Sequence, residues 1–414
     1  MEKNLIKKII LEHQGYIADL QILKRKYTFE PGINYILTGQ RRAGKTYMLY
    51  SRMQEIIRSA SPEHLLYVNF EDERLIGMAT SGFDLLLDAY KELWPHKPFI
   101  FLDELQIVEG WEKFARRLAD SGYSIYITGS NSRMLSHEMA SVLGGRFMIR
   151  EIDTLSFPEF LSFNGLIPNE HFALSEQRFE IQRLFNSWFI YGGFPEILRF
   201  TDKREYLSNL FQKVFLGDLA IRYQIRNTKA LKLLIKKLAE STMDEVSYNR
   251  MRNILISAGM QVSTTTVIEY VAYLIETYLI ASVENVKSKI SQRESKKKYY
   301  FRDNGFLGLF LNEPESILLE TMVYNFLKKK YDNIFYIRNN YEVDFYIPEK
   351  ALIQVCYTIE EYSTLQREIS ALLKALKEYP VEQLVIITYN TEHKVENNGQ
   401  LIEVIPAWKW MLTL

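Results

Sequence analysis

The chain has 414 residues, of which 47% are hydrophobic and 25% are charged. This composition is typical of a globular protein and excludes disorder as the main state, and at roughly 100–200 residues per domain the length predicts two to four domains. The net charge is zero, with 51 basic and 51 acidic residues, so binding to nucleic acid or to a membrane would need a local patch. The single cysteine, Cys356, excludes an internal disulfide and a cysteine-based zinc cluster.

The N-terminal segment contains an apolar run that Lys7 and Lys8 interrupt. This pattern matches neither a signal peptide nor a membrane span. The sequence has no uninterrupted apolar stretch of about eighteen residues, the length at which a membrane-spanning helix becomes a candidate. We therefore expect a cytoplasmic protein that makes no contact with a membrane.

The first third of the chain alternates between short apolar runs and helical patterns. The apolar runs predict strands at 34–38, 65–70, 98–102, 124–128 and 146–152. Helical spacing predicts helices at 47–60, 83–93 and 111–120. Continuous apolar strands separated by helices predict a parallel sheet that is covered on both faces.

The rest of the chain changes pattern twice. Residues from 157 to about 239 are helical and aromatic, and the next sixty residues predict helix, turn, helix and two strands. The last part predicts a small α/β domain with helices at 318–329 and 364–378 and strands at 334–337, 343–347, 352–357 and 384–388. We therefore expect four domains: an ATPase core at 1–155, a helical lid or linker at 156–240, a winged helix-turn-helix at 241–303 and an α/β domain at 304–414.

Residues 39–46 read GQRRAGKT and fit the phosphate-loop pattern GxxxxGK[ST]. The segment follows a predicted strand and opens a predicted helix, so backbone N–H groups and the helix N-terminus would face phosphate oxygens. Lys45 would bridge the β- and γ-phosphates, and Thr46 would bind Mg²⁺. The residues expected to contact the nucleotide are Gly39, Gln40, Arg41, Arg42, Ala43, Gly44, Lys45 and Thr46.

A second signal is the apolar run FIFL, which ends in Asp103 and Glu104. Asp103 would hold Mg²⁺ through water, and Glu104 would orient the attacking water in line with the γ-phosphate. The catalytic residues are therefore expected to be Glu104, Lys45 and Asp103, with Thr46 and Asp103 at the metal. The alternative for the two acids is a solvent-exposed pair at the end of a strand.

A third predicted strand, SIYIT, runs into Gly129, Ser130, Asn131 and Ser132. Ser130 and Asn131 are candidates for sensing the γ-phosphate, and a polar N-cap of the next helix is the alternative. Arg146 is a candidate for an arginine that stabilises transition-state charge, in its own site or in that of a neighbouring subunit. A surface arginine is an equal alternative for this residue.

Six motifs carry a family resemblance in the order TGQRRAGKT, FLDELQ, ITGSNSRML, LGGRF, LSFPEF and YGGFPE. The chain resembles AAA+/STAND-like P-loop ATPases of the additional-strand class. More narrowly, it resembles prokaryotic AAA-family ATPases that end in a restriction-endonuclease-like domain. The resemblance is strong over residues 1–230 and weaker beyond them. It implies that the nucleotide is ATP and that Gly193 and Pro195 serve a nucleotide-dependent hinge, with a plain helix break as the alternative.

The helix-turn-helix pattern spans 247–255 and 264–279, and the two strands that follow would form a wing. The short polar residues that open the second helix could cap it and face phosphates or bases. The wing would form a phosphate-binding patch for DNA, and a solvated hairpin used in protein contacts is the alternative. Its charged residues are Lys287, Lys289, Arg293, Lys296, Lys297 and Lys298, against Glu294 alone.

The C-terminal pattern resembles the PD-(D/E)xK nuclease core, in which two acids hold Mg²⁺ and a lysine activates water. Glu320 lies on the opening helix and Asp344 fits the first acid. Gln354 stands at the place of the second acid and Cys356 at the place of the lysine. A neutral amide binds Mg²⁺ poorly, and a thiol does not supply a positive charge at neutral pH. We therefore predict a nuclease fold without nuclease activity.

The sequence leaves three hypotheses open. In the first, ATP hydrolysis with Mg²⁺ drives a conformational change that acts on DNA or on another partner. In the second, ATP is a slow switch that controls binding to DNA, to a protein or to further copies of the chain, and the C-terminal domain is a non-catalytic binding module. The third is a nuclease gated by ATP, which Gln354 and Cys356 disfavour.

Overall fold

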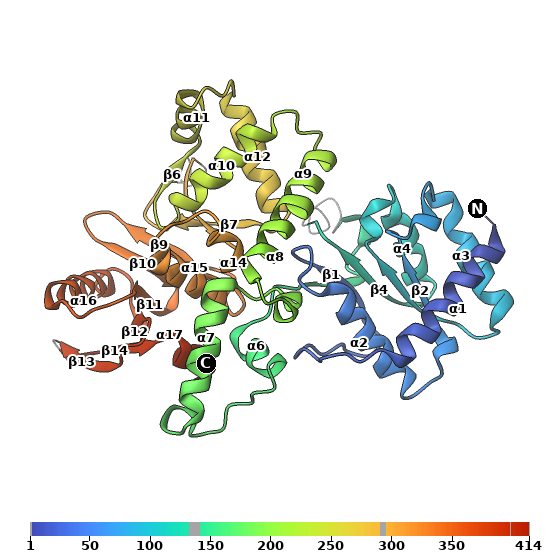
Figure 1. Ribbon diagram of the computed structural model, residues 1–414, viewed down its shortest axis with the longest axis horizontal. Helices are drawn as coiled ribbons and strands as arrows, with labels where there is room; N and C mark the ends of the chain where they lie inside the picture. The colour runs from blue at the N-terminus through green and yellow to red at the C-terminus, as the bar shows by residue number, and fades with distance from the viewer. Residues whose placement is uncertain (1, 132–140, 290–294, 398, 414) are drawn as a thin grey trace. The chain divides into compact units, whose positions relative to one another are not determined.

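The computed structural model describes residues 2–131, 141–289, 295–397 and 399–413. The chain divides into two compact units (Figure 1). The first comprises Met1–Thr154 and Glu276–Tyr278, and the second comprises Leu155–Ile275 and Leu279–Leu414. Over the described ranges, the helices are all too short or too polar to cross a membrane.

The first unit is built on a five-stranded parallel sheet with the order β2-β3-β4-β1-β5. The order places β4 between β1 and β3, so the strand after the acidic pair is inserted beside the strand that precedes the phosphate loop. This parallel α/β sheet confirms the predicted P-loop NTPase fold. The strands are β1 (Asn34–Thr38), β2 (Leu65–Asn69), β3 (Phe99–Asp103), β4 (Ser124–Gly129) and β5 (Phe147–Glu151).

Helices cover both faces of this sheet because its strands present apolar side chains in both directions. Ile36 of β1 belongs to a buried cluster with three helices, whereas its neighbours Tyr35 and Leu37 belong to a second cluster with one helix. The three helices are α1 (Lys3–Asp19), α3 (Phe83–Leu93) and α4 (Trp111–Asp120), and the one on the other face is α2 (Lys45–Ile57).

Helix α1 was not expected from the sequence, because lysines interrupt its apolar run. Those lysines lie on the outer side of the helix, where Lys3 is 2.7 Å and Lys7 is 2.5 Å from the carboxylate of Glu92 on α3. The apolar residues of α1, including Ile6 and Ile10, face the sheet and are buried. The lysines therefore mark the outer edge of an amphipathic helix.

The second unit contains a nine-stranded mixed sheet with the order β13-β14-β12-β11-β10-β9-β7-β8-β6. Its strands are β6 (Val246–Ser247), β7 (Ile280–Asn285), β8 (Lys296–Phe301), β9 (Phe335–Arg338), β10 (Glu342–Ile347), β11 (Glu349–Cys356), β12 (Val381–Thr388), β13 (His393–Asn397) and β14 (Gln400–Pro406). The sequence analysis did not predict β13, β14 or the helix that follows them.

The helices of the second unit begin with α6 after the first sheet and end with α17 near the C-terminus. They are α6 (Phe157–Phe163), α7 (Gln177–Tyr191), α8 (Lys203–Leu210), α9 (Gly217–Arg222), α10 (Thr228–Glu240), α11 (Tyr248–Ser257), α12 (Thr264–Glu276), α14 (Asn304–Leu307), α15 (Glu315–Lys328), α16 (Tyr362–Leu376) and α17 (Ala407–Thr413). A π-helical segment, Phe211–Leu216, joins α8 to α9. Helix α16 packs on one face of the C-terminal strands, and α15, α17 and α7 pack on the other.

The hairpin of β7 and β8, which the sequence assigned to the wing, is part of the same sheet as the C-terminal strands. Strand β7 pairs in parallel with β9, where Glu284 lies opposite Phe335 and Asn285 lies opposite Tyr336. Asn285 also donates 2.9 Å to the carbonyl oxygen of Arg338. The sheet therefore continues across residue 303, the boundary expected from the sequence, and residues 155–275 and 279–414 form one unit.

The YGGFPE turn lies inside the second unit and is fixed by a buried carboxylate. The N–H of Gly193 donates 2.9 Å to Asp303 Oδ2, and the carbonyl oxygen of Gly193 accepts 2.7 Å from the N–H of Leu155. A Cβ on Gly192, where φ is +74°, would lie 1.8 Å from Asp303 Oδ1. The glycines therefore permit a close approach to Asp303, and these contacts do not support a loose hinge at Gly193 and Pro195.

Candidate nucleotide site

The loop between β1 and α2 holds the backbone conformation that its sequence predicts. Gly39 and Gly44 have φ angles of +136° and +97°, and Arg42 has a φ of +64°. Positive φ angles turn successive peptide groups, so that N–H groups can face an anion. A Cβ on Gly39 would lie 2.1 Å from the carbonyl oxygen of Ile152. The loop therefore packs against the backbone that leaves β5 and tolerates only glycine at this position.

Lys45 opens α2 and is 4% exposed. Its Nζ donates 3.1 Å to the carbonyl oxygen of Gly39 and 3.0 Å to that of Gln40. Burial lowers the pKa of Lys45, and the carboxylate of Glu104, at 3.9 Å from Nζ, opposes that shift. The loop carbonyls thus hold the ammonium group at the position where phosphate oxygens would replace them.

Asp103 is the last residue of β3 and is 1% exposed. Its Oδ2 accepts 2.9 Å from the hydroxyl of Tyr67, and its Oδ1 accepts from the hydroxyl of Thr128. A hydrogen bond also links it to Thr46. Burial raises the pKa of the Asp103 carboxyl, and these hydrogen bonds lower it. A cation beside the carboxylate would offset the same burial.

Glu104 follows β3 in a left-handed conformation with a φ of +52°. Its N–H donates 2.9 Å to the hydroxyl of Thr128, so one threonine on β4 contacts both members of the acidic pair. The carboxylate of Glu104 accepts a hydrogen bond from Gln106, whose amide nitrogen also lies 3.3 Å from Ser130 Oγ. These contacts aim the Glu104 side chain toward Lys45 rather than along the strand.

The structure brings together most of the residues that the sequence placed in the site. Lys45, Thr46, Asp103 and Glu104 meet at the carboxyl ends of β1 and β3, and Ser130 is linked to them through Gln106. Asn131 is buried at the end of β4. Ser132 and the rest of the ITGSNSRML motif lie outside the described residues.

Three residues of this network were not predicted: Tyr67, Gln106 and Thr128. Thr128 is the last residue of the predicted SIYIT strand, and Tyr67 lies in the LLYVNF strand. The sequence shows that polar groups end neighbouring strands, but a hydroxyl within an apolar run is also common in cores. Only the strand order, which places β3 between β2 and β4, reveals that both hydroxyls reach Asp103.

The arginines of the loop and of the LGGRF motif have different places. Arg41 forms an ion pair of 2.9 Å with Glu71. Arg146 forms an ion pair with Asp120, and its carbonyl oxygen accepts 3.3 Å from Asn34, the first residue of β1. Because the phosphate loop follows the last residue of β1, Arg146 lies at the opposite edge of the sheet from the loop of its own chain.

The wing does not present the basic patch that its sequence predicts. Lys298 is 1% exposed and lies among carboxylates, Lys297 is 3.2 Å from Glu284, and Lys287 is paired with Glu378. Lys289 and Lys296 are exposed, and Arg293 lies outside the described residues. The prediction of one continuous phosphate-binding patch is therefore wrong for these lysines, because acids distant in sequence neutralise them.

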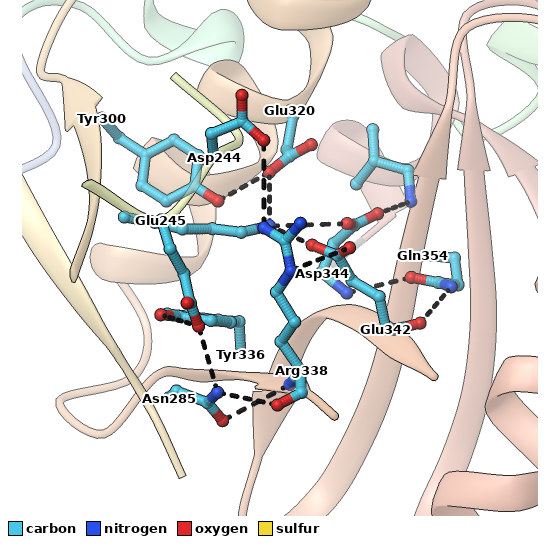
Figure 2. A network of polar contacts seen from close by, with 12 residues as sticks. Asp244, Glu245, Asn285, Tyr300, Glu320, Tyr336, Arg338, Glu342, Asp344 and Gln354 are labelled. Carbon is cyan, nitrogen blue, oxygen red and sulfur yellow. Dashed lines mark hydrogen bonds and ion pairs between the residues drawn. The ribbon is translucent and has the colours of Figure 1, made fainter. Parts of the chain in front are cut away.

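The nuclease-like residues also differ from an open metal site. Gln354 donates from Nε2 to Glu368 at 2.8 Å and to the carbonyl oxygen of Glu342 at 2.9 Å, and its Oε1 accepts 2.9 Å from the N–H of Asp344 (Figure 2). The amide therefore joins strands and helix as a structural group. Burial raises the pKa of the Cys356 thiol to about 11, so the thiol is neutral at neutral pH.

Comparison with known proteins gives the family. A family model described as an AAA domain matches residues 33–161, and a model described as a domain of unknown function (DUF8612) matches residues 182–316. The uncharacterized protein MJ1544 of Methanocaldococcus jannaschii is 35% identical over 430 residues, which cover 100% of this chain and 96% of the relative. The chain belongs to the family of this archaeal protein. With the parallel sheet described above, the match shows an AAA-family P-loop ATPase domain in the first unit.

Two further likenesses are weaker. An uncharacterized protein of Haemophilus influenzae is 29% identical over 396 residues, which cover 91% of this chain and 94% of the relative. The solved structure of the Walker-type ATPase PABY2304 of Pyrococcus abyssi matches 75% of this chain and 95% of its own, with a TM-score of 0.38 and 12% identity. A TM-score this low does not by itself establish a common fold.

Proposed function

We propose that the first unit binds ATP with Mg²⁺ and hydrolyses it. The observation that carries the proposal is the placement of Glu104, whose carboxylate lies 3.9 Å from Nζ of the phosphate-loop lysine, Lys45. The donor set also fits the cofactor, because the buried Asp103 carboxylate and the Thr46 hydroxyl are the hard oxygen ligands that Mg²⁺ prefers. The γ-phosphoryl group of bound Mg²⁺–ATP is the centre that water attacks.

Each residue has one task in this proposal. Lys45 exchanges its bonds to the loop carbonyls for bonds to phosphate oxygens, and loop N–H groups bind the remaining phosphate charge. Thr46 and Asp103 hold the cation. Glu104 accepts a hydrogen bond from the attacking water and orients it in line. Ser130 and Gln106 connect the position of the γ-phosphate to the Glu104 side chain, with Asn131 as a second candidate at the same strand end.

Steady-state hydrolysis and nucleotide binding test the proposal. We expect Glu104→Gln to bind ATP with unchanged affinity and to lose hydrolysis by about 10²–10⁴-fold, the contribution of a positioned general base. Glu109→Gln is the matched control, because Glu109 is exposed five residues further along the chain. Lys45→Ala should lose ATP binding itself. Hydrolysis by Glu104→Gln at the wild-type rate would show that another group activates the water.

Hydrolysis is proposed to act on the segment that leaves the first unit. The N–H of Ile152 donates 2.7 Å to the carbonyl oxygen of Thr38, directly before the phosphate loop. A change of loop conformation therefore acts on residues 152–154 through backbone contacts. The slow-switch hypothesis uses the same route, with turnover incidental. Turnover slow enough to leave ATP bound for minutes would favour the switch, and turnover stimulated by a partner would favour the motor.

The proposed partners are DNA, a protein or further copies of the chain. The proposal of a winged helix-turn-helix draws on α10, α11 and α12 followed by the β7–β8 hairpin, with β6 paired to β8. For DNA, exposed Lys289 and Lys296 are the remaining candidates on the wing. Charge reversal of both should lower duplex affinity and reduce the salt slope by about one per phosphate contact. Binding that these changes leave intact would direct the search to a protein partner.

For the C-terminal strands we retain the proposal of a nuclease-like fold without nuclease activity. It is supported by the engaged amide of Gln354 and the neutral thiol of Cys356. A Mg²⁺-dependent cleavage assay on single-stranded and duplex DNA tests it. Cleavage that Asp344→Ala abolishes would overturn the proposal.

A further inference from the structure

Lys298 of β8 lies inside a cluster of three carboxylates that come from other elements of the second unit. Its Nζ is 3.0 Å from Glu342 Oε1, 3.6 Å from Glu320 Oε1 and 3.9 Å from Asp344 Oδ1. Figure 2 shows the side chains of Glu320, Glu342 and Asp344 facing a common centre. Lys298 and Glu320 are each 1% exposed. A lysine from the wing hairpin therefore stands between an acid of α15 and two acids of β10.

The distances suit an ammonium group and do not suit a metal ion. Oxygen ligands lie about 2.0–2.1 Å from Mg²⁺ and about 2.3–2.6 Å from Ca²⁺. The three carboxylates lie 3.0–3.9 Å from Nζ, which is the range of an ion pair. Among the described residues, no group of three His, Cys, Asp or Glu side chains is placed to hold a metal ion. Lys298 occupies the space in which such a group would have to converge.

The carboxylates nevertheless retain capacity to bind a cation. Glu320 Oε1 accepts 2.6 Å from the hydroxyl of Tyr300, whereas Glu320 Oε2 is buried and has no hydrogen-bond partner among the described residues. Glu320 lines a pocket of about 560 Å³ together with Lys298, Glu342 and Asp344. The cluster contains three carboxylates and one ammonium group, so its acids exceed its bases by two. Loss of the ammonium would leave them without any positive charge in contact.

We infer that the ammonium group of Lys298 is a built-in cation that takes the place of a divalent metal ion, and that its removal turns the cluster into a divalent-cation site. The attraction between the acids and Lys298 offsets the cost of burying charged groups, and a buried pair that loses one partner is strongly destabilised. Carboxylates are the ligands that hard divalent cations prefer, and their side chains need to move little to close on a metal. This inference concerns the second unit and does not depend on ATP hydrolysis.

Titration of nucleotide-free protein with Mn²⁺, followed by calorimetry and by thermal unfolding, tests the inference. Lys298→Met removes the charge and keeps an unbranched apolar side chain. Lys296→Met is the matched control, because it changes an exposed lysine two residues away on the same strand. We expect Lys298→Met to bind one more Mn²⁺ per chain than wild type or Lys296→Met and to regain thermal stability with Mn²⁺. The additional Mn²⁺ should disappear in Lys298→Met/Glu320→Gln, and Lys298→Arg should not bind it.

Three results would overturn the inference. The first is a Mn²⁺ site in the wild type that Glu320→Gln removes, since Lys298 would then coexist with a metal. The second is a folded Lys298→Met that binds no more Mn²⁺ than Lys296→Met. The third applies if Lys298→Met does not fold without metal: refolding in millimolar Mn²⁺ should then recover the folded protein, and failure to recover it would contradict the proposed exchange of ammonium for metal.

Discussion

Arg25 donates a hydrogen bond of 3.0 Å from Nη1 to the carbonyl oxygen of Ala43 in the phosphate loop. The same Nη1 donates 2.9 Å to the carbonyl oxygen of Asp153, two residues after β5. One guanidinium group therefore joins the phosphate loop to the chain segment that leaves the first unit. It acts from the segment between α1 and β1, which the sequence analysis did not assign to the site.

We expect Arg25→Ala to weaken the first unit and to reduce ATP affinity. Hydrogen bonds to charged groups contribute about 1.5–3 kcal/mol each, and the variant loses those to two carbonyl oxygens. Denaturant unfolding and nucleotide titration measure the two effects. Lys26→Ala is the control, because Lys26 is exposed beside Arg25. Equal results for the two variants would show that Arg25 does not support the loop.

Thr128 tests the link between the two acids of the site. Thr128→Val keeps the shape of the side chain and removes the bonds to Asp103 and to the N–H of Glu104. We expect a loss of about 1–3 kcal/mol in the free energy of unfolding and a larger loss of hydrolysis than of ATP binding. Thr128→Ser keeps the hydroxyl and should retain most of the activity. A serine variant as impaired as the valine variant would assign the effect to packing instead.

Local sequence predicted the first sheet well, because its strands are continuous apolar runs and its turns carry clear signals. The phosphate loop and the acidic pair were also predictable, since each is a contiguous motif. What the sequence could not show was which distant residues meet. Lys298 reads as part of a basic run, yet it is buried, because Glu320 and Asp344 reach it from elements that follow it in the chain. Arg146 reads as a charge-stabilising arginine, yet strand direction places it at the far edge of the sheet.

Asp303 provides a test of the turn that follows α7. Its carboxylate accepts 2.9 Å from the N–H of Gly193 and 2.8 Å from the N–H of Gly305. Asp303→Ala should lower the free energy of unfolding of the second unit by about 1–3 kcal/mol for each buried N–H left without a partner. Chemical denaturation measures the loss, and Asp332→Ala, at an exposed aspartate, is the control. Equal stability of the two variants would mean that the turn does not need its carboxylate.

His13 predicts a dependence of stability on pH. Its ring packs edge-on against Tyr67, with ring centroids 4.7 Å apart, and its Nε2 is buried without a hydrogen-bond partner among the described residues. Burial lowers the pKa of His13 below its ordinary value of 6.5, a shift that Asp72 and Glu12 oppose and Arg74 reinforces. As the pH falls through 6.5 toward the folded-state pKa, the unfolded chain binds a proton that the folded chain does not. The first unit should therefore lose stability in that window.

The measurement is the thermal unfolding midpoint at about pH 8 and about pH 5, on either side of the range in which histidine titrates. His13→Phe keeps an aromatic ring against Tyr67 and removes the titrating group, so its midpoint should fall less than that of the wild type between the two pH values. His393→Phe, which changes an exposed histidine on β13, should fall as much as the wild type. If His13→Phe loses as much stability as the wild type, protonation of His13 does not account for the acid sensitivity of the first unit, and carboxylates with hydrogen bonds in the folded state would have to supply it.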